Sequence, residues 1–409
     1  MADGAPSRAR VLPKVALLVL SLVPLLPTLR AHAVGDLPVY FDATRAWLAG
    51  RTPYAEVPFE YPPYALVAFL PAAVVSSTLR EFQLAFGLEL LAVDIAIRVA
   101  LLWVARARRG GWAYAPFLAY AVVAQLQAFW LYKRFDLLPA GLTLATVLLL
   151  SGGAAGRAGA ALVAGIGTKV YPVVLVPLAL VHALRIGRLR RFLVGAGLAV
   201  LPLAVLAVVW PLQRAVGFHS GRGLQVESLW ASLLWLFRGW TGVEWVHAPA
   251  SYEVQGGLAP AVLPVAIAIW AVGTGVAVLL SVRRTDGPGR GALAERALLP
   301  LLALVALGPV ASPQYLLWIA TVAALLLEPE RWRLALAPLA AAILTRLTYP
   351  APGYQTGLST ALTAVLVIRN LLLVVGLWPL VLAASRHART PPGSRRGGCP
   401  GTCPPAGAR

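Results

Sequence analysis

Three long apolar runs limit what this chain can fold into more than any other feature of its sequence. The runs are Leu189–Leu212, Ala259–Val282 and Leu358–Ala384. Each is about as long as the roughly 20 apolar residues that cross the hydrocarbon layer of a bilayer. Of 409 residues, 59% are hydrophobic and only 12% are charged, whereas a soluble domain carries about 25% charged residues. One soluble core cannot bury so much apolar surface, so the sequence predicts an all-α, polytopic membrane protein.

The net charge of +19 has two interpretations. It could mark a nucleic-acid partner, or it could follow the rule that basic residues stay on the cytoplasmic side of a membrane. When the chain is threaded through a bilayer, the cytoplasmic segments hold 22 Lys and Arg against 5 Asp and Glu, and the outer segments hold 10 against 9. The charge is therefore an orientation signal, and we expect a bilayer and no nucleic acid as partner.

About 12 spans result from this threading, and two segments need special treatment. Residues 62–78 are interpreted as a helix in the outer interface, because a span there would place the arginines of 106–109 outside. Residues 158–184 are interpreted as a short helical hairpin that turns at Gly167–Pro172, with Lys169 at its outer tip. The hairpin supplies two spans, and the others are 12–29, 82–105, 112–131, 136–152, 192–213, 259–282, 296–311, 314–328, 333–349 and 358–384.

The chain divides into a membrane domain, 1–385, and a tail, 386–409. The first apolar run is rich in proline and lacks a small-residue cleavage site, so we interpret it as a span and not as a signal peptide. The tail is basic and rich in Pro and Gly, and we expect it to be disordered; its Cys399 and Cys403 are a weak metal signal. Both termini are expected in the cytoplasm of a multi-pass plasma-membrane protein.

Two outer loops, 31–60 and 214–258, hold ionisable and aromatic residues that membrane topology does not require. Within the second loop, residues 228–240 carry leucines on one stripe with three tryptophans nearby, a composition that suits a helix lying at the interface. An aromatic belt is the simpler explanation for the tryptophans.

At these loops the chain resembles a known family, the polyprenol-phosphate-mannose-dependent α-mannosyltransferases of glycosyltransferase family 87 (the DUF2029 type), in the GT-C superfamily. The resemblance covers most of residues 30–350 and rests on the order of six short motifs. The motifs are Asp36 with Tyr40, Gly50 with Tyr54, Tyr61-Pro62-Pro63, Gly165-Ile-Gly-Thr-Lys169-Val-Tyr171-Pro172, Arg222-Gly-Leu-Gln225-Val-Glu227-Ser228 and Ser312-Pro313-Gln314-Tyr315. It implies a GT-C bundle with interfacial helices in the first and a later extracytoplasmic loop.

The resemblance also implies a reaction, transfer of a sugar such as mannose from a polyprenyl-phosphate donor to an extracytoplasmic acceptor hydroxyl with inversion. The acceptor would be a glycolipid or another glycan. Because the leaving phosphate is a stable anion, one general base suffices, whereas glycoside hydrolysis normally needs two carboxylates. By resemblance, Asp36 holds the place of the catalytic carboxylate, just after the first span; the alternative is that it caps the following helix. Asp42 is the rival carboxylate.

Cations are expected at the leaving phosphate, where charge develops in the transition state. The candidates are Lys169, Arg222 and Arg346; the alternatives are snorkelling to the headgroups for Lys169 and Arg346, and an ion pair with Glu227 for Arg222. Candidates for binding the sugar or the acceptor share a place at the outer surface, and they are Tyr40, His219, Gln225, Glu227, Gln314 and Tyr315.

Other charged residues have a structural interpretation. Asp94 and Arg98 lie one helical turn apart and are expected to pair. Lys133, Arg134 and Asp136 form an outer corner that we interpret as an ion-paired loop in preference to a phosphate site. Arg369 lies in mid-span and should face a polar cavity or a partner.

No metal or cofactor is expected, since the sequence has no DxD motif, no HExxH motif and no histidine pair at ligand spacing. We therefore predict catalysis that EDTA does not inhibit. Two other functions stay open. A transporter would show internal repeats and polar residues at mid-membrane, which we do not find. A polysaccharide polymerase or ligase that uses lipid-linked sugars differs from this prediction only in its loop motifs.

Overall fold

The computed structural model describes residues 8–30, 35–106, 108, 110–214, 221–248, 251–283 and 290–386. The first half of the chain forms a series of helices broken by short turns. Its elements are α1 (Arg8–Leu22), the 3-10 helix η1 (Val23–Leu29), α2 (Leu37–Leu48), α3 (Pro63–Val74), α4 (Leu79–Arg106), α5 (Ala115–Leu126), α6 (Ala128–Leu131), α7 (Leu137–Ser151), α8 (Ala155–Thr168), η2 (Tyr171–Leu175), α9 (Val176–Arg185) and α10 (Leu189–Val209).

The second half adds a small antiparallel sheet to five longer helices. Its elements are β1 (Leu224–Gln225), α12 (Leu229–Leu236), α13 (Arg238–Thr241), β2 (Glu244–Ala248), β3 (Ser251–Gln255), α14 (Ala259–Arg283), α15 (Arg290–Leu307), α16 (Tyr315–Ala324), α17 (Trp332–Thr348) and α18 (Thr360–Arg386). The strand order is β1-β3-β2, with Trp245 opposite Val254. The sequence analysis did not foresee this sheet within the predominantly helical fold.

Among the described residues, three helices are long and apolar enough to cross a membrane by length and composition: Leu189–Val209, Ala259–Arg283 and Thr360–Ser385. They match the three runs from which the prediction started. Only 11% of the α10 window is buried inside the protein, so its apolar side chains need lipid around them. Other predicted spans correspond to the shorter apolar helices α5, α7 and α16.

The two segments that the charge count set apart have the predicted secondary structure. Residues 63–74 form the short helix α3, which packs against both α4 and α8. Residues 155–185 form two short helices and η2, and the chain turns at Lys169, whose φ of −155° and ψ of 129° end α8. Pro172 at the start of η2 fixes the direction of the return, since proline suits the first turn of a helix.

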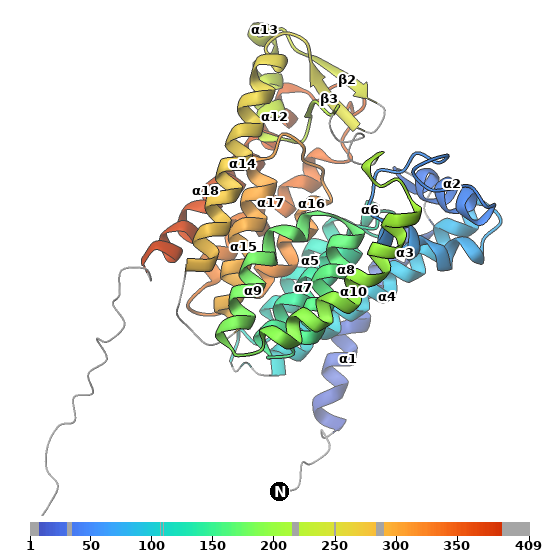
Figure 1. Cartoon of the computed structure of the whole chain (residues 1–409). Coiled ribbons are helices and arrows are strands. Elements are labelled where there is room, and N and C mark those ends of the chain that lie inside the picture. The colour runs from blue at the N-terminus through green and yellow to red at the C-terminus, as the bar shows by residue number, and fades with distance from the viewer. Residues whose placement is uncertain are drawn as a thin grey trace, which may run out of the picture.

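Loops meet at two opposite ends of the bundle (Figure 1). The end that carries α2, α3, α12 and the sheet is called the site end below, and α1 projects from the opposite end. At that opposite end, arginines join neighbouring turns. Arg108 donates to the carbonyl oxygens of Leu325 and Leu327, both at 2.7 Å, and Arg188 donates to the carbonyl of Gly153.

One predicted ion pair lies in the middle of α4. Asp94 and Arg98 are both fully buried, and Nε of Arg98 lies 3.1 Å from the carboxylate. The hydroxyls of Tyr120 and Tyr132 donate to the same carboxylate at 2.6 and 2.7 Å. The prediction of this pair is confirmed, and the carboxylate is more completely satisfied than spacing alone could indicate.

Candidate active site at the site end of the bundle

Asp36 lies at the start of α2, but its side chain does not cap the helix. The residue is in the cap position without a side-chain hydrogen bond to the first turn. Its Oδ2 instead lies 3.5 Å from Nη1 of Arg134 and accepts a hydrogen bond from the Tyr40 hydroxyl at 3.3 Å. The side chain of Asp36 is 29% exposed, so the carboxylate can still be reached by another molecule.

Gly35 allows Arg134 to come this close. Its φ of +70° lies in the left-handed region that favours glycine. A Cβ at this position would also lie 3.2 Å from Nη2 of Arg134. A side chain there would therefore strain the backbone and press on the guanidinium that pairs with Asp36.

Lys169 forms a second ion pair at the tip of the hairpin. Its Nζ lies 2.7 Å from Oδ1 of Asp136, and Trp318 donates its indole N–H to the same oxygen at 2.9 Å. Four aromatic rings surround the ammonium at 4.8–5.5 Å from their centroids, and they belong to Tyr61, Phe135, Tyr315 and Trp318. Aromatic faces and one carboxylate thus keep a cation stable where little water reaches it.

Arg222 pairs with Glu60 and not with Glu227, so the alternative of an Arg222–Glu227 pair is wrong. Glu60 directly precedes Tyr61, whose ring faces Lys169, and this places the third pair beside the second. The three pairs, Asp36–Arg134, Asp136–Lys169 and Glu60–Arg222, are called the ion-pair cluster below.

The hydroxyl of Tyr40 lies within electrostatic reach of four charged residues of the ion-pair cluster. Burial raises the pKa of its hydroxyl well above the usual range, the carboxylates of Asp36, Asp136 and Glu60 raise it further, and Arg134 lowers it. The ring of Tyr40 also contacts that of Tyr61, with centroids 6.0 Å apart. Carboxylates from three separate segments therefore lie within electrostatic reach of one buried phenol.

Glu227 has a different environment. It is fully buried, its Oε2 lies 2.6 Å from Nη2 of Arg369, and Arg369 also donates to the Glu227 carbonyl at 2.7 Å. Asn370 donates to the same carbonyl at 3.2 Å. This contact answers what the mid-span arginine faces: it joins α18 to the turn before α12.

The remaining residues predicted to bind the phosphate, the sugar or the acceptor lie in different surroundings. Tyr315 stacks on Trp318, with centroids 3.8 Å apart, beside Lys169. Gln314 is buried and accepts a hydrogen bond from Ser312 at 2.6 Å, while Gln225 lies in β1. Arg346 is exposed on α17 and, within the described ranges, forms no hydrogen bond or ion pair. His219 lies outside the described residues.

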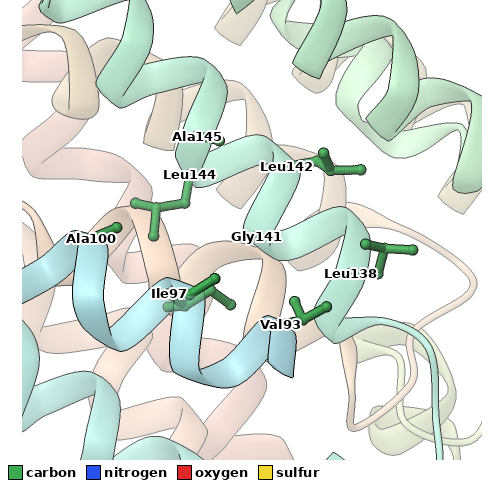
Figure 2. Close-up of a pocket in the computed structure, with 9 residues that line it drawn as sticks. Val93, Ile97, Ala100, Leu138, Gly141, Leu142, Leu144 and Ala145 are labelled. Atoms are coloured by element: carbon green, nitrogen blue, oxygen red, sulfur yellow. The ribbon is translucent and has the colours of Figure 1, made fainter. Parts of the chain in front are cut away.

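An apolar groove runs between α4 and α7 (Figure 2). Its first lining residue on α7 is Leu138, two residues after Asp136 in the sequence. Its volume is about 280 Å³, near the lower end for ligand pockets, roughly 300 Å³. Gly141 allows α7 to approach α4 closely beside the groove, because a Cβ at this position would lie only 3.3 Å from Ile97. Every lining residue is apolar: Val93, Ala96, Ile97, Ala100, Leu138, Gly141, Leu142, Leu144 and Ala145.

Sequence analysis missed the importance of Arg134 and Asp136. Both were noted as members of a charged outer corner and interpreted as a self-contained loop. The corner is ion-paired as predicted, but its partners are Asp36 and Lys169, which come from other segments. The signal was present, since two adjacent predicted spans left Lys133–Asp136 at the same end as Asp36.

Metal ligands do not gather in the described part of the chain: no group of three or more His, Cys, Asp or Glu residues could hold an ion there. The three pairs of the ion-pair cluster each join one carboxylate to one cation.

Comparison with known proteins identifies the fold. No protein-family model matches the chain, and no curated protein matches it. Among solved structures, the chain is similar to the crystal structure of ArnT from Cupriavidus metallidurans bound to undecaprenyl phosphate, with a TM-score of 0.50 and 16% sequence identity. The match covers 94% of this chain and 78% of ArnT. The prediction of a predominantly helical bundle is confirmed, and the chain shares the overall fold of ArnT.

Proposed function

We propose that this protein is a membrane glycosyltransferase that moves a sugar from a polyprenyl-phosphate donor to an acceptor hydroxyl. The observation that carries the proposal is the ion-pair cluster, in which an accessible carboxylate, Asp36, lies beside Arg134, and Lys169 forms a neighbouring pair with Asp136. The similarity to ArnT supports the same class, because ArnT was crystallised with undecaprenyl phosphate.

Asp36 is the general base of the proposed reaction. The acceptor oxygen attacks the anomeric carbon from the face opposite the phosphate, the bond from that carbon to the phosphate oxygen breaks, and its electron pair stays on the phosphate. The acceptor proton passes to Asp36. Because the attack comes from the face opposite the leaving phosphate, the configuration at the anomeric carbon is inverted. Asp36 is better suited to this role than Asp136, because the Asp136 side chain is only 1% exposed and holds two donors.

Lys169 and Arg134 bind the leaving phosphate. Cations fixed before the reaction stabilise charge that develops in the transition state, and they do so most strongly where water is excluded. Lys169 is only 12% exposed and Arg134 16%. Arg222, the third cation of the cluster, pairs with Glu60, and the ring of the next residue, Tyr61, contacts Lys169. Gln225, Gln314 and Tyr315 remain candidates for contacts with the sugar or the acceptor.

The groove between α4 and α7 takes the start of the polyprenyl chain. It is lined only by apolar side chains, which match an isoprenoid and offer nothing to a sugar. From Leu138 to Ala145 the α7 wall runs about 10 Å at 1.5 Å per residue.

The sugar and the location belong to the same proposal. Mannose is supported by the motifs of glycosyltransferase family 87, and a glycolipid or glycan acceptor fits a site on the outer face. The excess of basic residues at the opposite end supports a cytoplasmic position for that end and for both termini of the multi-pass chain.

A transfer assay tests the proposal. Membranes containing the protein are given radiolabelled polyprenyl-phosphate-mannose and a panel of glycolipid and glycan acceptors. We expect Asp36→Asn to reduce transfer about 100- to 10,000-fold, the range that general bases contribute, while the protein folds normally. Asp42→Asn is the matched control, because it makes the same change on an exposed residue of the same helix. Full activity of Asp36→Asn would refute the assignment of the base.

A further inference from the structure

Each cation that would meet the donor phosphate is already neutralised by an aspartate. Arg134 lies against Asp36, and Lys169 lies against Asp136. Asp36 is also the carboxylate to which the proposed function gives the acceptor proton. The phosphate and the base therefore compete for one guanidinium.

We infer that Arg134 exchanges partners when the donor binds: its guanidinium leaves Asp36 for the phosphate, and this frees Asp36 to act as the base. The inference rests on the proposed function and deepens it. Its consequence is an order of events, in which the donor binds first and the acceptor is activated only after the phosphate is in place.

The geometry of the Asp36–Arg134 pair suits an exchange. The two atoms are 3.5 Å apart, and the side chains are 29% and 16% exposed. Tyr40 donates to the same carboxylate oxygen, so Asp36 keeps one donor after the arginine has left. The Asp36–Arg134 pair is longer than the Asp136–Lys169 pair, and its carboxylate is more exposed, so it is the easier of the two pairs to separate.

The Asp136–Lys169 pair is built differently and stays closed. Its atoms lie 2.7 Å apart, the Asp136 side chain is only 1% exposed, and Trp318 holds the same oxygen. Breaking it would leave a buried carboxylate with one donor fewer, which is costly. Lys169 can reach a phosphate with its remaining N–H groups, since an ammonium has three.

Charge favours the exchange. Each pair of the cluster is neutral, so an incoming phosphate adds negative charge beside Asp36 in a site with little water. A guanidinium that turns to the phosphate can donate two parallel hydrogen bonds, a geometry in which arginine and phosphate match.

The test is the affinity of the detergent-purified full-length protein for undecaprenyl phosphate, measured at constant salt. Wild type is compared with Asp36→Asn, Arg134→Gln and the double variant. We expect Asp36→Asn to bind about 2- to 5-fold more tightly, the effect of removing a partly exposed competitor. Arg134→Gln should bind at least about 10-fold more weakly, as a lost charged hydrogen bond predicts. In the double variant, Asp36→Asn should add no tightening.

Asp42→Asn is the control for charge alone, because it removes the same charge from the same helix and makes no ion pair among the described residues. Unchanged or weaker binding by Asp36→Asn would overturn the exchange, and so would equal tightening by Asp42→Asn or tightening that survives in the double variant. In each of these cases the proposed function would stand. If wild type does not bind undecaprenyl phosphate, the exchange and the proposed function both fail. If Arg134→Gln does not fold, the comparison of Asp36→Asn with Asp42→Asn decides.

Discussion

Two aspartate–arginine pairs in the first half of the chain show how burial changes what an ion pair can do. Asp94–Arg98 lies within one helix, is fully buried at 3.1 Å, and has two tyrosine hydroxyls on the carboxylate. Asp36–Arg134 joins two segments at 3.5 Å and is partly exposed. The first pair has no accessible alternative partner, so it serves stability. In the proposed mechanism, the second pair exchanges one partner for another during the reaction.

The two pairs should differ in how much their carboxylate charge contributes to the free energy of unfolding. We expect Asp94→Asn to lower the free energy of unfolding by about 3–5 kcal/mol, because the charge of Arg98 would remain buried without its partner. Asp36→Asn should lower it by less than about 1 kcal/mol, as for exposed pairs. Equilibrium unfolding in mixed micelles measures both values.

A double variant is the control for this prediction. Replacing both residues with apolar ones, Asp94→Leu with Arg98→Met, removes the uncompensated charge and should recover part of the stability lost in Asp94→Asn. The recovery is incomplete because the hydroxyls of Tyr120 and Tyr132 lose their acceptor. Equal loss of stability in Asp36→Asn and Asp94→Asn would contradict the distinction between the pairs.

Removing single hydroxyls sharpens the comparison on a smaller scale. Tyr132→Phe takes away a 2.7 Å donor from the buried Asp94 and should cost about 1–3 kcal/mol of stability. Tyr40→Phe takes away a 3.3 Å donor from the accessible Asp36, and we expect a smaller loss.

Tyr40→Phe should lose more activity than Tyr132→Phe, although it is expected to lose less stability. Tyr40 orients the proposed base, so Tyr40→Phe should lower kcat about 3- to 10-fold with little change in KM, the scale of one hydrogen bond. Folded Tyr132→Phe should keep the wild-type kcat. A Tyr132→Phe variant that folds well but loses more activity than Tyr40→Phe would contradict the separation between the stability pair and the proposed chemical pair.

Much of the fold could be predicted because membranes impose local rules. Apolar length predicted α10, α14 and α18, and counting charges set apart α3 and the hairpin at Lys169. The pairing of Asp94 with Arg98 followed from helical spacing alone. The helix expected within residues 228–240 is present as α12 and α13. The small sheet beside it was missed because its strands are only two to five residues long.

The partners within the candidate site could not be predicted in the same way. Asp136 and Lys169 are 33 residues apart, and Arg222 finds Glu60 from the first loop rather than Glu227 in its own segment. Such pairings depend on how helices pack, which no local pattern contains. Asp36 was selected through a family resemblance, and Lys169 through its place at the tip of the predicted hairpin. Only the three-dimensional arrangement shows that Arg134 and Asp136 lie opposite them.

A structure of the protein with bound undecaprenyl phosphate, determined by cryo-electron microscopy in a lipid nanodisc, tests the account most directly. We predict the phosphate within hydrogen-bond distance of Lys169 and Arg134, the first isoprene units in the groove between α4 and α7, and Asp36 released from Arg134. A phosphate bound away from Lys169 and Arg134, with the groove empty, would contradict the proposed site.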